Sequence, residues 1–425
     1  MLEKILFKIK KIIPLKLFRQ LQPFYHYTLS LIGAIIYRFP SRKIFVIGIT
    51  GTKGKTSTVE LVNAILETAG YKTALAGTLR FKIGNLSENN KFKMTMPGRF
   101  FIQQFLRKTV NKKCDFVILE MTSEGTKQFR HKFIQLNSLI YTNLAPEHIE
   151  SHGSYEKYRE AKLKIAKTLE KSHKKRKSII VNADDQESSH FLNIDIKKKY
   201  QYSLSEAQPF ELKKDGLSLT IDKQKINSCL SGEFNIYNIL AAITFAKTQN
   251  IGITTIKKAI EHFKGIRGRV ERIDEGQDFT VIVDYAHTPD SLEKLYEAFP
   301  NSKRICVLGN TGGGRDKWKR KIMGALADKY CSEIILTNED PYDENPRTII
   351  DNMIEGIKKP IYQIIMDRKE AIQKAVSLAQ TGDIVLITGK GTDPYIMGPN
   401  NSKLKWDDAI IARESIINLL QSKNG

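Results

Sequence analysis

A short apolar run followed at once by a glycine-rich, lysine-containing loop constrains this fold more than any other feature. Residues 44–47 (IFVI) predict a buried strand, residues 48–57 (GITGTKGKTS) form the loop, and residues 57–69 predict a helix. Glycines let backbone N–H groups approach phosphates, and the helix N-terminus adds positive potential there. We therefore expect half of a parallel βαβ unit that binds phosphate groups.

The residue types in this loop suggest roles in nucleotide binding. Ile49 stands where the strict Walker pattern has its first glycine, so the loop is a variant. Lys55 is expected to reach the β- and γ-phosphates, and the Thr56 hydroxyl to bind Mg²⁺. The predicted nucleotide contacts of the loop are Gly51, Thr52, Lys53, Gly54, Lys55, Thr56 and Ser57.

Strand-like and helix-like stretches alternate beyond the loop. Further strands are predicted at 116–119, 138–142 and 177–181, and helices at 155–169 and 235–248. A second alternation begins near residue 267. Its predicted strands are 279–284, 304–308, 333–337 and 383–388. Its predicted helices are about 290–298, 317–330, 346–358, 367–380 and 407–421.

These patterns predict an α/β protein with three parts. A basic amphipathic segment (1–42) precedes a central P-loop ATP-binding domain with a mainly parallel sheet (43–266). A C-terminal doubly wound, Rossmann-like domain (267–425) follows.

Composition narrows the classes of partner. Among 425 residues, 68 are Lys or Arg and 46 are Asp or Glu, giving a formal charge of +22. Such an excess favours anionic partners such as nucleotides, phosphorylated substrates, nucleic acid or an acidic membrane, although surface lysines can simply be solvated. None of the four cysteines forms a CxxC pair. We therefore expect no zinc ribbon, no disulfide framework, and a reduced, cytosolic protein.

The N-terminal segment is basic and apolar but has neither a signal-peptide core nor a run approaching 18 apolar residues. Residues 1–22 carry six cationic side chains against one acidic residue, Glu3: Lys4, Lys8, Lys10, Lys11, Lys16 and Arg19. They could form a helix at a membrane surface, kinked at Pro14, or a helix docked on the protein's own core.

Three further residues suit a magnesium site. Glu120 ends the predicted strand at 116–119 and would lie beside the phosphate loop in a parallel sheet, where a carboxylate suits Mg²⁺. His148 follows the next strand and could be a metal ligand. Lys162 lies in the helix predicted after it.

Several segments, in order, resemble the Mur ligase family of ATP-dependent amide ligases of cell-wall synthesis, above all its tripeptide synthetases. The segments are 50–56 (TGTKGKT), 142–153 (TNLAPEHIESHG), 158–162 (YREAK), 232–242 (GEFNIYNILAA) and 283–290 (VDYAHTPD). The resemblance implies that Lys162 is carbamylated and, with His148 and Glu120, helps to hold a second Mg²⁺. It also implies ATP contacts from Asn235, Asn238, Arg269 and Asp284, the two asparagines having amides free to hydrogen-bond.

The resemblance also implies two substrate sites. Acceptor contacts would come from Thr95, Met96, Thr122, Gln128 and Arg130, although Met96 and the nearby Glu124 depart from the usual Thr and His. Amino-acid contacts would come from Arg315, Glu339, Asp340, Tyr342, Gly389 and Asp393. Tyr342 replaces the arginine that reads the distal carboxylate of diaminopimelate. The acidic residues around it (Glu339, Asp340, Asp343 and Glu344) predict a preference for lysine or a similar diamino acid.

We therefore expect a monomeric ligase that uses ATP and Mg²⁺ to join an amino acid to a muramyl-peptide-type carboxylate through an acyl phosphate. Only about 42 residues precede the first strand, too few for the family's UDP-binding domain, so recognition of a UDP group is not expected. One alternative is a folylpolyglutamate-synthetase-like ligase, whose loop usually has Gly-Ser after the lysine instead of Thr56-Ser57. The others are a basic nucleic-acid-binding NTPase, for which no basic-aromatic RNA motif is visible, and an inactive membrane-surface scaffold.

Overall fold

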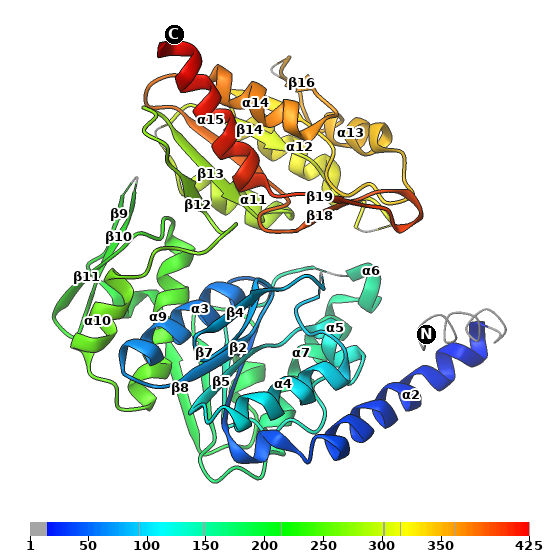
Figure 1. Cartoon of the computed structure of the whole chain (residues 1–425), viewed down its shortest axis with the longest axis vertical. Coiled ribbons are helices and arrows are strands. Elements are labelled where there is room, and N and C mark those ends of the chain that lie inside the picture. The colour runs from blue at the N-terminus through cyan, green and yellow to red at the C-terminus, as the bar shows by residue number, and fades with distance from the viewer. Residues whose placement is uncertain are drawn as a thin grey trace. The chain divides into compact units, whose positions relative to one another are not determined.

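The computed structural model describes residues 15–92, 94–147, 149–213, 215–300, 302–314, 316–360 and 362–424 (Figure 1). The chain forms two compact units, each described by itself. Unit 1 comprises residues up to 144 together with 156–202 and 241–251, and unit 2 comprises 145–155, 203–240 and 252–425.

An eight-stranded sheet forms the centre of unit 1. The strands are β1 (Phe45–Thr50), β2 (Thr73–Ala76), β3 (Arg80–Ile83), β4 (Leu86–Asn89), β5 (Phe116–Glu120), β6 (Ser138–Tyr141), β7 (Ser178–Asn182) and β8 (Lys198–Tyr202). Their order is β4-β3-β2-β5-β1-β6-β7-β8. All neighbours from β2 to β8 are parallel, and β3 and β4 add an antiparallel edge. The expected mainly parallel sheet is confirmed.

The central strands are apolar along their whole length because both sheet faces are covered. Every residue of β5, β6 and β7 is buried. The helices of this unit are α2 (Leu15–Ile36), α3 (Lys55–Thr68), α4 (Arg99–Asn111), α5 (Ser123–Lys127), α7 (Tyr155–Glu170) and α8 (Ser188–Leu192), with a 3₁₀ turn, η1, at Pro40–Lys43. Helix α3 begins at Lys55, two residues before the predicted start, so the last residues of the phosphate loop are already helical.

Unit 2 contains three further sheets. The small sheet has the order β11-β10-β9, and β18 pairs with β19. The large sheet has the order β12-β13-β17-β14-β15-β16, in which β12 alone is antiparallel to its neighbour. The strands are β9 (Glu211–Lys213), β10 (Gly216–Ile221), β11 (Gln224–Ser228), β12 (Glu271–Ile273), β13 (Thr280–Asp284), β14 (Arg304–Leu308), β15 (Glu333–Leu336), β16 (Tyr362–Ile364), β17 (Ile384–Thr388), β18 (Tyr395–Met397) and β19 (Lys403–Lys405).

Helices cover both faces of the large sheet (Figure 1). Alternate residues of β13 face opposite sides: Val281 and Val283 pack in one apolar cluster with α14 and α15, whereas Ile282 packs in the other with α11 and α12. The doubly wound arrangement is therefore confirmed. The helices are α6 (Ile149–His152), α9 (Glu233–Thr248, which continues into unit 1), α10 (Ile253–Glu261), α11 (Pro289–Glu297), α12 (Lys319–Tyr330), α13 (Pro346–Ile354), α14 (Arg368–Leu378) and α15 (Asp408–Asn424), with 3₁₀ turns at Leu204–Ala207 and Pro399–Asn401.

The expectation that the cysteines are reduced is wrong for one pair. Cys306 on β14 and Cys331, directly after α12, form a disulfide with a Cα–Cα distance of 6.2 Å. The residues are 25 positions apart and in no recognisable pair pattern, and only the packing of α12 on the sheet brings them together. Cys114 is free and buried, and Cys229 is free and exposed.

Among the described residues, no helix combines the length and the apolar character needed to cross a membrane. The predicted kink at Pro14 lies outside the described residues. Helix α2 is docked on unit 1 through its C-terminal half, where the Ser30 hydroxyl donates a hydrogen bond to the Phe129 carbonyl oxygen.

Candidate active site

The phosphate loop lies at the carboxyl edge of the unit 1 sheet, where β1 is flanked by β5 and β6. Ile49 of β1 pairs with Glu120 of β5, so the end of β5 lies beside the start of the loop. On the other side, β6 leads directly to Thr142 and Asn143. Ligands of open parallel sheets bind at such a carboxyl edge, where neighbouring strands lead away in opposite directions.

Backbone contacts with the segment after β6 fix the shape of the loop. The N–H groups of Thr52 and Lys53 donate to the backbone oxygen and to Oδ1 of Asn143, at 2.8 and 2.9 Å. A Cβ atom at Gly51 would lie 1.9 Å from the Thr142 hydroxyl oxygen, so no other residue fits there. Gly54 precedes α3 with φ at +78°, in the left-handed region.

Two lysine ammonium groups meet at this loop. Lys55 Nζ donates to the carbonyl oxygens of Gly51 and Thr52, at 3.1 and 2.8 Å. Lys162 Nζ, on α7, donates to the Gly51 carbonyl at 2.6 Å and lies 4.7 Å from the centre of the Tyr158 ring. The Lys162 side chain is buried. The structure therefore places both predicted lysines at the loop, although their segments are more than a hundred residues apart.

The Glu120 carboxylate joins two of the expected magnesium-binding groups. Its Oε1 accepts a hydrogen bond from the Thr56 hydroxyl at 3.1 Å, and the residue is 2% exposed. Mg²⁺ in nucleotide sites is typically held by one or two protein oxygens together with substrate phosphates and water. A threonine hydroxyl and a carboxylate in contact, beside a phosphate loop, fit such an ion.

The sequence did not identify Thr78, which also contacts Glu120. Its hydroxyl and its backbone N–H donate to the two carboxylate oxygens, at 2.9 and 2.8 Å. Thr78 follows β2, and β2 is parallel to β5, so both strands end at the same edge. In the sequence, Thr78 is marked only by a Gly-Thr pair directly after a strand. This order is too common to identify a functional residue.

The third expected member of the metal cluster, His148, lies outside the described residues. Within the described ranges, no group of three or more His, Cys, Asp or Glu side chains is arranged to hold a metal ion. Among the described residues, Thr56 and Glu120 therefore remain as candidate oxygen ligands for a metal ion beside the loop.

The predicted acceptor residues come together in unit 1. Thr95 shares a hydrogen bond of 2.8 Å with Thr78, which links this group to Glu120. Arg130 donates to the carbonyl oxygen of Met96 and, at 2.6 Å, to Oε1 of Gln128. The Thr122 hydroxyl caps α5 by accepting from the backbone N–H of Gly125, and the N–H of Thr122 contacts the Met96 sulfur at 3.4 Å.

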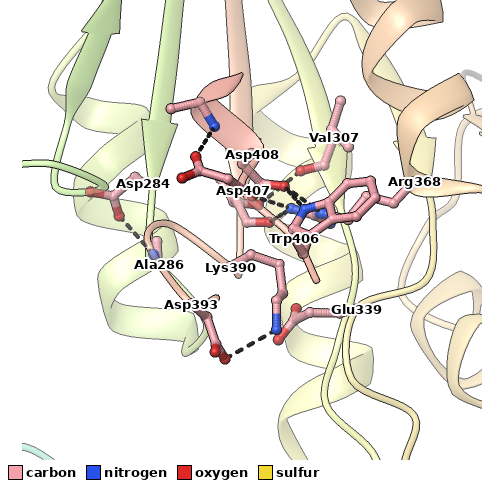
Figure 2. Close-up of polar contacts among 12 residues, drawn as sticks. Asp284, Ala286, Val307, Glu339, Arg368, Lys390, Asp393, Trp406, Asp407 and Asp408 are labelled. Atoms are coloured by element: carbon pink, nitrogen blue, oxygen red, sulfur yellow. Dashed lines mark hydrogen bonds and ion pairs between the residues drawn. The ribbon is translucent and has the colours of Figure 1, made fainter. Parts of the chain in front are cut away.

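The residues predicted to bind the adenine and ribose side are engaged within unit 2. Asn235 and Asn238 are buried, and their NH₂ groups donate to the Ser231 carbonyl and to Oδ1 of Asn235, so each side-chain amide already has one partner within the protein. The Asp284 carboxylate accepts from the backbone N–H groups of Val270 and Ala286, both at 2.7 Å. Figure 2 shows the Asp284–Ala286 contact.

The Arg269 guanidinium lies 4.5 Å from the centre of the Tyr285 ring. Asp284 thus stabilises the turn after β13 through its hydrogen bonds, and Arg269 stacks on the Tyr285 ring in that turn.

The predicted amino-acid site lies at the carboxyl ends of β14, β15 and β17. Lys390 Nζ is 2.8 Å from Asp340 Oδ1 and 3.0 Å from Asp393 Oδ2, the second contact being visible in Figure 2. Burial alone would lower the pKa of Lys390, but the charges of Asp393 and Asp340 raise it. Both carboxylates therefore share one cation of the protein itself.

The other acidic residues are also engaged. The Glu344 carboxylate receives two hydrogen bonds from the fully buried Arg320, at 2.7 and 2.9 Å, and these bonds lower the pKa of Glu344. Glu339 is buried and its Oε1 accepts from the Thr311 hydroxyl; burial raises its pKa. Asp340 and Glu344, two members of the predicted acidic cluster, therefore already have cationic partners within the protein, Lys390 and Arg320. The preference for a cationic substrate stays a prediction.

Tyr342 and Gly389 complete the described part of this site, and Arg315 lies outside the described residues. A Cβ on Gly313 would lie 3.1 Å from the Tyr342 ring, so the ring packs directly on Gly313. A Cβ on Gly389 would lie 2.4 Å from Oε2 of Glu339, and φ at this position is +103°, so glycine is strongly favoured here.

A buried ion pair behind this site was not predicted. Arg368 on α14 and Asp408 on α15 are fully buried and pair with each other (Figure 2). Arg368 Nη2 also donates to the Thr388 carbonyl at the end of β17. Trp406 Nε1 donates to Asp408 at 2.7 Å. This network fixes the point at which the 389–393 loop begins.

Two family models match this chain. The model of the Mur ligase middle domain matches residues 49–246, and that of the Mur ligase glutamate ligase domain matches residues 268–391. A UDP-N-acetylmuramoyl-L-alanyl-D-glutamate--2,6-diaminopimelate ligase from Syntrophomonas wolfei is 37% identical over 405 residues, which cover 91% of this chain and 81% of the relative.

Two solved structures resemble this chain over most of its length. A structure of a UDP-N-acetylmuramoyl-L-alanyl-D-glutamate--2,6-diaminopimelate ligase is 27% identical with a TM-score of 0.62, covering 89% of this chain and 79% of that one. A folylpolyglutamate synthase of Mycobacterium tuberculosis has a TM-score of 0.70, covering 92% and 95% of the two chains, at 13% identity. At that identity the second likeness extends to the fold alone.

Proposed function

Because this chain belongs to the Mur ligase family, we propose that it uses ATP to join a diamino acid to the carboxylate of a muramyl-peptide-type acceptor. The chain is an ATP-dependent, peptide-bond-forming ligase of peptidoglycan precursor synthesis. The observation that carries the residue assignment is the contact between the phosphate loop and Glu120 through Thr56.

The first half of the proposed reaction is phosphoryl transfer. The loop N–H groups and Lys55 hold the β- and γ-phosphates of ATP, and a carboxylate oxygen of the acceptor attacks the γ-phosphorus. The products are an acyl phosphate and ADP. Mg²⁺ held by Thr56 and Glu120 would supply positive charge at the phosphate oxygens. Thr78 keeps both oxygens of Glu120 oriented.

The second half is attack by the amine. The amino group of the incoming amino acid attacks the acyl carbon, phosphate leaves, and the amine loses a proton. A water-excluding site favours this outcome, because water would otherwise hydrolyse the activated acyl group. We assign the binding of the amino acid to the segments around Arg315, Tyr342 and Asp393 in unit 2.

We propose that Lys162 is a carbamate in the active protein. Its neutral amine adds CO₂ and releases a proton, which turns a cation into an anionic oxygen ligand. Lys162 Nζ lies 2.6 Å from the Gly51 carbonyl, so the modified side chain would stand at the loop beside the nucleotide phosphates. His148 and Glu120 are its proposed partners around a second Mg²⁺.

The acceptor is assigned to the group formed by Thr95, Met96, Thr122, Gln128 and Arg130. Arg130 suits a carboxylate because its planar guanidinium can donate two parallel hydrogen bonds. The hydrogen bonds from Thr95 through Thr78 to Glu120 support an acceptor that lies next to the phosphoryl group.

For the amine, lysine and diaminopimelate are the two candidates. The Syntrophomonas wolfei relative is a 2,6-diaminopimelate ligase by name. Because Asp340 and Glu344 are paired internally, the preference for lysine depends mainly on Tyr342, which supplies no cation for a distal carboxylate, and on the exposed Asp343 beside it. We propose lysine on this basis.

A phosphate-release screen tests the proposal. Purified protein with MgATP receives lysine, diaminopimelate and other amino acids, each with UDP-linked and lipid-linked muramyl dipeptides and with a folate acceptor. We expect release that requires both a muramyl acceptor and an amino acid. Lys55→Ala should be inactive, and the exposed Lys225→Ala is the matched control. Release with the folate acceptor alone would favour the folylpolyglutamate-synthetase-like alternative.

A further inference from the structure

Helix α2 carries an apolar face that unit 1 does not cover. This face consists of Leu21, Phe24, Tyr25, Ile32, Ile35 and Ile36, whose exposed fractions run from 40% to 72%. Their spacing of three, four, seven and eleven residues places them on one side of a helix with 3.6 residues per turn. Exposed apolar side chains gathered on one face mark an interaction site more often than scattered ones do.

The opposite side of α2 is the side that packs on the protein. Ser30, Gly33 and Ala34 are buried, and the Ser30 hydroxyl contacts the Phe129 carbonyl at 3.0 Å. The Tyr27 ring packs edge-on against Phe133. Docking thus fixes the rotation of the helix about its axis and keeps the apolar face turned outward.

The charge around α2 indicates the chemistry of the partner. From Lys4 to Thr50, before the phosphate-loop lysines, the sequence has no Asp or Glu but nine Lys and Arg residues. Arg38, Arg42 and Lys43 are exposed directly after the helix. Lys174 adds to them, because its Nζ donates to the Arg42 carbonyl at 3.0 Å. Lys16 and Arg19 lie in the first turns of the helix.

The exposed apolar face and the positive charge near it favour an anionic lipid surface over a second copy of the chain as the partner. A second copy of the chain would bring a formal charge of +22 and the same acid-free segment against this face, and like charges would repel. An anionic bilayer offers an apolar interior for the exposed side chains and negative headgroups for the cations that follow the helix.

We propose that the outward face of α2 lies in the headgroup region of an anionic membrane and holds the protein at that surface. The helix has 22 residues, about 33 Å in length, and would lie parallel to the bilayer. The helix does not span the bilayer, because Ser30, Gly33 and Ala34 remain packed on unit 1. Membrane docking of this kind is independent of the ligase chemistry.

Vesicle co-sedimentation of the full-length protein tests this proposal. We expect the wild type to bind vesicles of equal parts phosphatidylglycerol and phosphatidylcholine, more weakly at high salt, and to bind pure phosphatidylcholine poorly. The variant Phe24→Gln/Ile32→Gln/Ile35→Gln keeps good helix formers at exposed positions. We expect its partition coefficient on the anionic vesicles to fall about tenfold or more.

The control changes three exposed apolar side chains elsewhere, Leu86→Gln, Leu404→Gln and Ile410→Gln. It should bind vesicles like the wild type, and both variants should release phosphate like the wild type with soluble substrates. Absence of wild-type binding, or an equal loss in the control, would overturn the proposal. So would a wild-type dimer that the α2 variant converts to a monomer, because a second copy would then cover the face.

Discussion

The hydroxyl of Thr56 donates a hydrogen bond of 3.1 Å to Oε1 of Glu120. Thr56 is in the first turn of α3 and Glu120 ends β5, so the contact joins the phosphate loop to the neighbouring strand. Thr78 donates to the same carboxylate with its hydroxyl and its N–H. One carboxylate thus links the loop, the strand beside it and, through Thr95, the proposed acceptor group.

Removing the charge of Glu120 should impair use of magnesium. In Glu120→Gln an amide replaces the carboxylate at nearly the same volume, so a ligand charge is lost while the side chain still fills its place. We expect kcat to fall by about a hundredfold and half-saturation to require more Mg²⁺. Titrating Mg²⁺ against phosphate release checks this, with Glu170→Gln on α7 as control. An unchanged Mg²⁺ dependence would remove Glu120 from the metal site.

Lys162 should carry CO₂ in the active protein. The measurement is the ¹³C NMR spectrum of protein equilibrated with ¹³C-bicarbonate, which should contain a carbamate carbonyl signal that Lys162→Ala lacks. The variant should be nearly inactive, and short carboxylates should restore part of its activity by occupying the vacated position. A wild-type spectrum without that signal under turnover conditions would show that the residue acts as an ammonium group.

Tyr342 should control the choice of amine. A distal carboxylate needs a nearby cation, and a bidentate arginine is the most favourable one. Tyr342→Arg should therefore raise the ratio of kcat/KM for diaminopimelate to that for lysine by about tenfold to a hundredfold. Competition between the two amines in one reaction measures the ratio directly. If the wild type already prefers diaminopimelate, another residue reads the distal carboxylate.

Buried His131 should make the protein less stable in acid. Burial, together with the charges of Lys132 and Lys164, lowers the pKa of His131 from 6.5 to about 3. Between these values the unfolded chain binds a proton that the folded chain does not, so stability falls as the pH decreases from 6.5. At pH 5 the loss is about 2 kcal/mol.

His131→Gln cannot take up that proton. The difference between its unfolding free energies at pH 7 and pH 5, measured in urea, should be smaller than in the wild type by about the same 2 kcal/mol. The exposed His173→Gln is the control and should leave the difference unchanged. Identical pH dependence in the wild type and His131→Gln would mean that the imidazole is protonated in the folded state.

The sequence predicted the buried parallel strands well and the exposed strands poorly. Strands β1, β5, β13 and β17 are runs of apolar residues that stand out without any structural knowledge. Strand β4 (Leu86–Asn89) has four exposed residues and β9 (Glu211–Lys213) has three, so neither has a buried face to produce a pattern. Edge strands of this kind form because a neighbour offers hydrogen bonds, which local sequence does not reveal.

For the candidate site, motif order pointed to the loop, Glu120 and Lys162, but it did not reveal which charged side chains pair with each other. Asp340 looked available in the sequence because its partner, Lys390, lies 50 residues away. Glu344 also looked available, because its partner, Arg320, lies 24 residues away. Whether an acidic residue binds a substrate or an internal cation depends on contacts between remote segments. Thr78 was missed because one threonine after a strand carries no signal.

The transfer of an oxygen atom from acceptor to phosphate tests the central claim most directly. The acceptor carboxylate is labelled with ¹⁸O and incubated with MgATP, an accepted amino acid and the protein, and the released phosphate is analysed by mass spectrometry. An acyl phosphate requires one labelled oxygen in the phosphate for each amide formed, and Lys55→Ala should give neither product. Amide formation with unlabelled phosphate would contradict phosphoryl transfer to the acceptor and the site assignment built on it.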